Sequence, residues 1–573
     1  MTERTMKKRH ILMGILLGTT ALQAQEPEKT ATQLDRTVVV ENLYNPDIMN
    51  ANKINIMPTL EEPQVAKKQI EYATSTKPSK QFGFAPMASF GETPQLADAQ
   101  KGYLRLGYGN RGNVDGRLSY RLDLGKRDEL NANLAFHGMD GTIELPEPIG
   151  DYEEWNARAY RTTGVIDWTH RFNPVSLSVE ADWENQVFNY MNFNQWADNT
   201  HQHNILGSVN ASVSSNNHDA DFRFHAGTGV LYAKQKYAFG YYDEQSSEPY
   251  AETIIRSHAQ VTGDINERTS VHLAAQMDNI MVNPGGDYKD VSLTVLQLNP
   301  YLTSEGKQWK ARIGAHIDPL FGNGGSEFSF APDLYGEYHV AKGYSVYLQT
   351  GGGRVLNDFR TINRFDPYAE FPVFRDGIEN KGFYSPRHSF HQLDGRLGFR
   401  ATPVNELSLH LYGGYRITKD QLFSTLVPDY SNEHLCYLMQ DDANLLYAGA
   451  SVLYAWKELF TTQAEIEWNK WDSDLTDTYS TLLPELSFRW TAEIHPIKAL
   501  SIGLSYQYEQ RCKDMSDNRP DAVNNLGITA SYRLFDWLSL YAQGDNLLNQ
   551  KYYQHMQQPA QGINVLGGAV LQF

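Results

Sequence analysis

The chain has 573 residues, of which 41% are hydrophobic, 21% charged and 12% aromatic, and its formal net charge is −18. This composition excludes collagen, coiled coils and bulk disorder, and the many aromatic and glycine residues favour strands and tight turns. No apolar run reaches the roughly 18 residues of a membrane-spanning helix, and the acidic balance argues against nucleic acid as a partner. Two cysteines, Cys436 and Cys512, are too few for a disulfide scaffold, and one bridge between them stays open.

The first 24 residues have the three parts of a secretory signal: a basic start, an apolar stretch over residues 11–22 and a small residue, Ala24, two positions later. About a dozen apolar residues are too few to cross a bilayer. We therefore predict that residues 1–24 are a signal peptide, cleaved near Ala24.

Residues 25–100 carry seven of the 24 prolines of the chain and show no sustained periodicity. Proline at that density prevents long helices and central strands. An apolar patch formed by Thr37, Val38, Val39 and Val40 is typical of a short strand that adds to another sheet. We predict a periplasmic or lumen-occupying segment here, with a solvated linker as the alternative for the remainder.

From residue 101 onward, apolar and polar side chains alternate along one segment after another. Val175 and Leu177 share one face of such a segment, and Ser176 and Ser178 share the other. A period of two predicts strands with one apolar and one polar face. About 22 such segments occur, with a count uncertain by about two, and short turns alternate with long loops between them.

We predict an all-β fold in which residues 101–573 form a transmembrane antiparallel β-barrel of about 22 strands. In many segments the alternation lasts for roughly 10 to 15 residues, which is long for a soluble β-sandwich or propeller and sufficient to cross a bilayer. Aromatic residues near the strand ends fit the girdles of such barrels. An unrelated porin with about 16 to 18 strands is the alternative.

Two C-terminal features carry a family resemblance. The last strand ends in Leu571 and Phe573, which resembles the signal by which the assembly machinery recognises bacterial outer-membrane barrels. The preceding run DNLLNQKYY, residues 545–553, resembles the C-terminal signature of TonB-dependent outer-membrane receptors. The residues that carry this second resemblance are Asn546, Leu547, Leu548, Asn549, Tyr552 and Tyr553.

This resemblance implies a Gram-negative outer membrane, solute uptake and coupling to TonB, in a style similar to receptor-like proteins of the Bacteroidetes. The patch Thr37–Val40 resembles the energy-coupling box of that family. Family receptors carry a globular plug domain between that box and the first strand, whereas this chain has only the proline-rich residues 25–100. The resemblance therefore covers the barrel and not the plug.

No motif in the sequence indicates catalysis or a bound metal or cofactor. The run from Gly107 to Gly112 satisfies G-x-G-x-x-G, but a period-two strand follows it, so we interpret it as a hairpin turn. The pairs His201/His203 and His388/His391 lack further ligands at suitable spacing and are interpreted as loop histidines. We predict that the chain is not an enzyme and has no catalytic, cofactor-binding or metal-binding residues.

The lumen of a barrel of about 22 strands is too wide for its own wall side chains to fill. One hypothesis is that residues 25–100 form a reduced plug in a receptor-like transport channel for a solute that the sequence does not identify. The alternative is a structural or accessory subunit of an outer-membrane complex, bound to a periplasmic or surface protein. The aromatic loop 355–386, with Phe359, Phe365 and Tyr368, is the candidate for an external binding or gating surface.

Overall fold

The computed structural model describes most of the chain from residue 101 onward. The described ranges are 101–149, 152–191, 201–217, 220–237, 249–283, 290–323, 325–368, 388–425, 437–478, 481–513, 517–556 and 558–573. The predicted signal peptide, the proline-rich segment with Thr37–Val40, and Cys436 lie outside these ranges.

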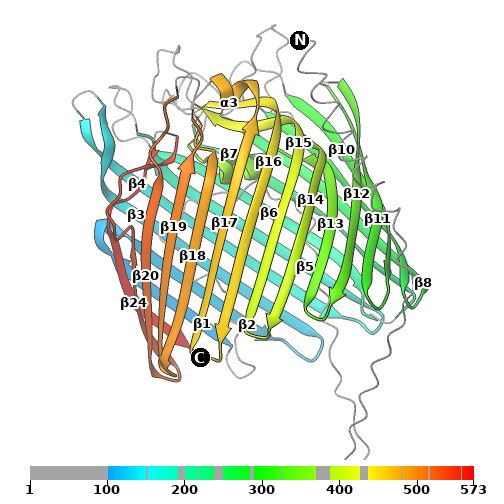
Figure 1. Ribbon diagram of the computed structural model, residues 1–573, viewed down its shortest axis with the longest axis horizontal. Helices are drawn as coiled ribbons and strands as arrows, with labels where there is room; N and C mark the ends of the chain where they lie inside the picture. The colour runs from blue at the N-terminus through cyan, green and yellow to red at the C-terminus, as the bar shows by residue number, and fades with distance from the viewer. Residues whose placement is uncertain are drawn as a thin grey trace, which may run out of the picture. The chain divides into compact units, whose positions relative to one another are not determined.

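Twenty-two strands form one antiparallel sheet (Figure 1). They are β1 (Gly102–Gly109), β2 (Val114–Asp123), β3 (Asp128–Ile149), β4 (Tyr152–Arg171), β5 (Val175–Asn189), β6 (His201–Ser215), β7 (Phe222–Gln235), β8 (Ala251–Asn266), β9 (Thr269–Asn283), β10 (Val291–Glu305), β11 (Trp309–Gly322), β12 (Gly325–Ala341), β13 (Tyr344–Val355), β14 (Ser389–Val404), β15 (Leu407–Thr425), β16 (Tyr437–Trp456), β17 (Phe460–Asp472), β18 (Pro484–Ile497), β19 (Leu500–Arg511), β20 (Val523–Phe535), β21 (Leu538–Asp545) and β24 (Asn564–Gln572).

Each strand of this sheet pairs with its neighbours in chain order, and β1 pairs with both β2 and β24. The sheet is therefore a closed barrel without a free edge. This confirms the predicted fold class and strand number, and it excludes both a β-sandwich and a porin with fewer strands.

The two ends of the barrel differ in their connections. Turns of a few residues, such as the one between β8 and β9, lie at the end where β1 begins and β24 finishes, and the backbone N–H of Lys101 donates to the Phe573 carbonyl there over 2.8 Å. The connection between β13 and β14, from Val355 to Ser389, lies at the other end. We call these the short-turn end and the long-loop end; Figure 1 shows the C-terminus at the former and α3 (Asp474–Thr478) at the latter.

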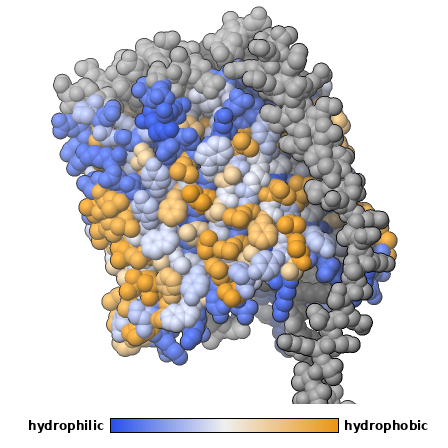
Figure 2. Space-filling view, viewed as in Figure 1, coloured by the Kyte–Doolittle hydropathy of each residue, from blue (hydrophilic) through white to orange (hydrophobic). Residues whose placement is uncertain are grey.

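The outer face of the barrel is apolar where the strands alternate. Leu397 and Ile313 are 64% and 63% exposed, and both point away from the lumen. Figure 2 shows hydrophobic residues covering the lower part of the visible wall, while the described residues near the long-loop end are hydrophilic. An outward apolar band of this kind is the surface that a barrel presents to lipid. Among the described residues no helix has the length and apolar character to cross a bilayer.

The lumen face of β13–β16 carries aromatic rings that lie over glycines of the adjacent strand. Tyr347 covers Gly398, and its hydroxyl is 2.9 Å from Nε2 of His410. Tyr412 covers Gly449. Because a glycine leaves the space that a flat ring needs, this pairing lets large side chains pack against the wall.

The Gly398→Ala variant tests this packing. A Cβ at residue 398 would overlap the ring of Tyr347, which is 2% exposed and has little room to move, whereas a Cβ at Gly336 on β12 would meet nothing within 4 Å. We expect Gly398→Ala to destabilise the barrel by about 1–3 kcal/mol. Loss of heat-modifiable mobility in SDS gels, measured against temperature, checks this; Gly336→Ala is the control and should unfold with the wild type.

Candidate functional site

Residues 356–368, which we call the crossing segment, leave the wall at the end of β13. The strand pairing of β13 slips by one residue between Gly351 and Gly353, and Gly353 adopts φ +109°, a conformation that side-chain-bearing residues rarely adopt. The segment then forms α2 (Phe359–Phe365), capped by Asp358, whose carboxylate accepts from the Thr361 N–H over 2.7 Å. The local sequence thus turns the chain and starts a short helix.

Polar contacts attach the crossing segment to two distant parts of the wall. Arg360 forms an ion pair of 2.7 Å with Asp182 on β5. At the other end, the Ser424 hydroxyl on β15 donates to Asp366 over 2.8 Å. Since β5 and β15 are ten strands apart in a ring of 22, these anchors lie on nearly opposite sides of the barrel. The segment therefore crosses the lumen at the long-loop end.

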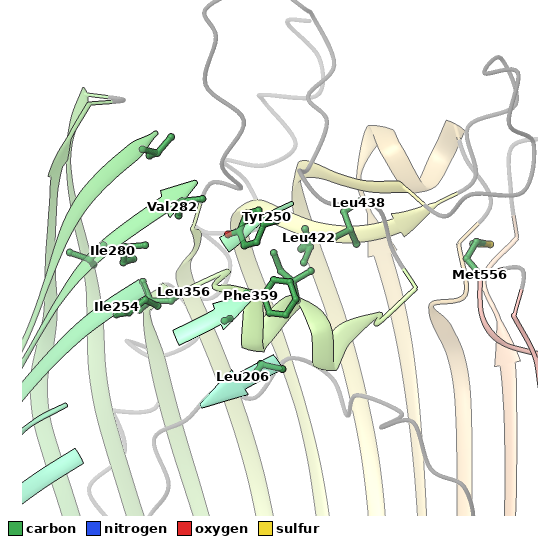
Figure 3. Packing of buried hydrophobic residues seen from close by; sticks show 14 residues of the cluster. Leu206, Tyr250, Ile254, Ile280, Val282, Leu356, Phe359, Leu422, Leu438 and Met556 are labelled. Carbon is green, nitrogen blue, oxygen red and sulfur yellow. The ribbon is translucent and has the colours of Figure 1, made fainter. Parts of the chain in front are cut away.

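An apolar cluster surrounds α2. Phe359 and Ile362 are at most 1% exposed, and they pack with side chains from strands on both sides of the barrel (Figure 3). The other buried members are Leu206, Ala233, Tyr250, Ile254, Ile280, Val282, Val291, Val295, Leu356, Leu422, Leu438 and Met556. Burial of these apolar side chains stabilises the packing of the helix against the wall.

A buried carboxyl group binds the start of α2. Glu252 on β8 accepts a hydrogen bond from the backbone N–H of Phe359 over 3.1 Å and another from the Tyr250 hydroxyl over 3.0 Å. The Tyr250 ring stacks on Phe359 with centroids 5.5 Å apart. Burial raises the pKa of Tyr250 well above its ordinary value, so the phenol stays protonated and donates to Glu252.

The strands β15 and β16 continue over α2. Their pairing shifts between Thr418 and Gln421, where Asp420 adopts φ 52°. An extra residue of this kind bends a strand. Figure 3 shows the parts of β15 and β16 that carry Leu422 and Leu438 running across α2 on its long-loop side. The hairpin thus covers the crossing segment.

The last described part of the segment packs against β4 and β5 and against a small two-stranded sheet, β22 (Tyr553–His555) with β23 (Gln558–Pro559). The Tyr368 ring lies 5.0 Å from Phe188 and 5.7 Å from His555. Burial raises the pKa of Tyr368 well above its ordinary value. The same cause lowers the pKa of His555, although the nearby Asp366 carboxylate acts in the opposite direction.

The start of the crossing segment is fixed to β14. The backbone N–H of Asn357 donates to Nδ1 of His388 over 3.1 Å, and the Asn357 amide donates to Ser389 over 3.0 Å. Burial lowers the pKa of His388 to about 4, with a smaller contribution from the Arg354 guanidinium. The imidazole is therefore neutral at pH 7 and accepts the Asn357 hydrogen bond.

The structure corrects the prediction for loop 355–386. Phe359 and Tyr368 are buried within the barrel and Phe365 packs against the apolar cluster, so this part is not an external surface. The aromatic content indicates that this loop packs against other side chains, but it does not indicate whether the loop packs inside the barrel or on its external surface. The residues Phe371, Phe374 and Tyr384 of the same loop lie outside the described ranges.

The C-terminal motif residues have local structural roles. Asn546 adopts φ 47°, is 1% exposed, and donates through its amide to the carbonyls of Gln550 and Gln561, both over 2.8 Å. The Asn549 side chain accepts from Ile563 N–H over 3.1 Å. Leu547 and Leu548 follow β21, and Leu548 is 42% exposed. Tyr552 is buried, and Tyr553 begins β22.

The terminal residues lie at the closure of the ring. Leu571 on β24 pairs with Leu104 on β1. Phe573 is 57% exposed, and its ring lies over Gly102. Cys512 is a free cysteine just after β19. Three of the four histidines interpreted as loop residues are in strands: His201 and His203 are in β6, and His391 is in β14. His388 lies in the connection directly before β14, as predicted.

Comparison with known proteins identifies the fold. No family model and no curated protein match the chain. Among solved structures, the FrpB iron transporter from Neisseria meningitidis aligns with TM-score 0.63 and 10% identity over 83% of this chain and 82% of that one. The copper transporter OprC gives 0.62 and 12% over 85% and 84%. The ferric-catecholate import receptor Fiu from E. coli K12 gives 0.59 and 9% over 84% and 82%.

The barrel thus has the fold of TonB-dependent outer-membrane receptors of Gram-negative bacteria, as the C-terminal resemblance implied.

We expect the start of the crossing segment to loosen as the pH falls. In an opened state His388 regains an ordinary pKa of about 6.5, so that state binds more protons than the closed one between pH 6.5 and the buried pKa of about 4. Opening therefore becomes easier over this interval and levels off below it. Hydrogen exchange at Asn357 and Phe359, corrected for intrinsic rates, measures the effect. The profile at Asn357, whose N–H donates to His388, should lose this increase in His388→Asn relative to the wild type. An unchanged profile in that variant would contradict the assignment.

Proposed function

We propose that the protein is a receptor-like outer-membrane channel for solute uptake, closed on its long-loop side by the crossing segment. The observation that carries this proposal is the attachment of that segment to nearly opposite walls through Arg360 and Asp366. Both anchors are non-covalent contacts of the segment that connects β13 to β14. They can therefore separate while every strand pair of the wall stays intact. A closure that opens without disturbing the sheet is what a gated channel requires.

Residues 25–100 are proposed to act as a reduced plug after export and signal cleavage near Ala24. The crossing segment occupies the lumen near the long-loop end, so a plug would serve the short-turn end, where β1 begins. The patch Thr37–Val40 would pair by strand addition with TonB or another periplasmic protein. Deletion of residues 37–40 should abolish energy-dependent uptake and leave the folded barrel in the membrane; unchanged uptake would sink this part of the proposal.

A second candidate function is a non-transporting structural subunit. It is favoured by the depth at which the crossing segment is buried, since Phe359, Ile362 and the Glu252 carboxyl group are all 5% exposed or less. A segment held in this way also suits a permanently closed barrel whose loops bind a partner protein.

Conductance in planar bilayers separates the two functions. We expect the mature wild-type chain to be silent. Arg360→Ala, which loses the ion pair to Asp182, should also stay mostly closed while residues 25–100 are present, because the proposed plug still blocks the other end. Removal of residues 25–100 alone should leave the barrel mostly closed, and the two changes together should give a large steady pore. The control is Arg161→Ala, which removes a comparable lumen-facing ion pair of 2.9 Å to Glu184 without touching the crossing segment.

Two results would overturn this account. A large pore on removal of residues 25–100 alone means that the crossing segment does not seal the lumen. Silence of all the variants, with the barrel folded, favours the structural subunit, and co-purification from membranes should then recover its partner.

A further inference from the structure

Two histidines on neighbouring strands point their ring nitrogens at each other inside the barrel. His225 lies on β7 and His258 on β8, and their Nε2 atoms are 3.1 Å apart. The rings are inclined by 29° with centroids 5.0 Å apart. Other histidines of the inner wall use their nitrogens differently: in His272, Nδ1 contacts the Thr262 hydroxyl over 2.9 Å and Nε2 the Thr303 hydroxyl over 2.8 Å.

Both histidines face the lumen. The pairing of β7 with β8 runs without a register shift, so side chains alternate strictly between the two faces. His258 shares its face with Ile254, which packs in the cluster around α2, and His225 shares its face with the buried Ala233. Val230 on β7 and Ile255 on β8 belong to the opposite face of these strands, and they are 47% and 39% exposed on the lipid side. His225 itself is exposed, so solutes in the lumen can reach the pair.

A glycine positions the His258 ring. Gly227 is the residue directly opposite His258 on β7, and a Cβ there would lie 2.8 Å from Cε1 of His258. The ring can therefore lie across the neighbouring strand toward His225. Directly opposite the two histidines stand Gln276 on β9 and Gln260 on β8, which bring carboxamide groups to the same face.

We propose that His225 and His258 form a two-imidazole site for a divalent late transition-metal ion, with Cu²⁺ bound most tightly. Metal–imidazole bonds of about 2.0–2.1 Å place two nitrogen ligands about 2.9 Å apart at a right angle and about 3.3 Å apart at the tetrahedral angle. The observed 3.1 Å lies between these values. Imidazole suits copper, nickel and zinc, and affinity generally rises to a maximum at Cu²⁺.

The coordination sphere is only half supplied by the wall. Within the described ranges, no group of three or more His, Cys, Asp or Glu side chains is arranged to hold a metal ion. Water, or donor atoms of a chelate that travels through the lumen, completes the sphere. The site would thus hold an ion or a partly coordinated complex in exchange with the lumen, not a permanently bound structural metal.

Binding of Cu²⁺ to the full mature barrel in detergent tests the proposal, with a purification tag that contains no histidine. We expect one equivalent whose electron paramagnetic resonance spectrum shows coupling to two imidazole nitrogens. His225→Asn and His258→Asn should each reduce the coupling to one nitrogen and raise the apparent Kd at least about tenfold. His410→Gln is the control, because His410 also faces the lumen but has its Nε2 beside the Tyr347 hydroxyl.

A variant that fails to fold would also lose Cu²⁺ binding, so the folding of each variant is checked by heat-modifiable mobility. Absence of Cu²⁺ binding by the wild type, or a two-nitrogen signal that survives in both variants, overturns the proposal. In that event the 3.1 Å contact is an ordinary imidazole–imidazole hydrogen bond, in which one ring donates and the other accepts.

Discussion

The pairing of β1 with β24 is the constraint on which the rest of the structure depends. Inside a bilayer, unpaired backbone N–H and C=O groups have no water to bind, so a membrane-spanning sheet must close on itself. Closure with 22 strands then fixes a second condition, because the resulting lumen is too wide for wall side chains to fill. The tyrosines that lie over glycines on β13–β16 thicken the wall. Closing the lumen nevertheless requires a segment that departs from the wall and enters the lumen.

The crossing segment, which we propose closes the lumen, makes polar contacts with some parts of the wall and apolar contacts with others. Its apolar residues, such as Phe359 and Ile362, are central and buried, whereas Arg360 and Asp366 reach outward to the wall. The apolar contacts provide most of the burial, and the charged groups select the strands to which the segment binds. The bend at Asp420 adds a cover from the long-loop side, so the segment is held between the wall and a hairpin.

The fold could be predicted from the sequence because its determinants are local. Alternation such as Val175–Ser176–Leu177–Ser178 reports a strand with two different faces, and a closed barrel repeats that pattern many times. The crossing segment could not be placed this way. Aromatic residues such as Phe359 and Tyr368 are compatible with packing inside the lumen or outside the barrel. Their inward orientation depends on partners on β4–β8 and β15 that are distant in the sequence. The same limit hid His225 and His258, which are 33 residues apart and meet only through the register of β7 and β8.

The join between β1 and β24 is one of the short strand pairings of the wall. It has seven residue pairs, against fourteen between β9 and β10, and includes the pair Gly107–Gly568. Its partners are separated by almost the whole barrel sequence, so the entropy lost on bringing them together is the largest of any strand pair. On this argument the join forms last. It has seven residue pairs, the same number as the pairing of β1 with β2 on the other side of the same strand. Strand β1 is thus held by two short pairings, so we expect strain in the membrane to separate β1 from its neighbours before it separates long pairings such as that of β9 with β10.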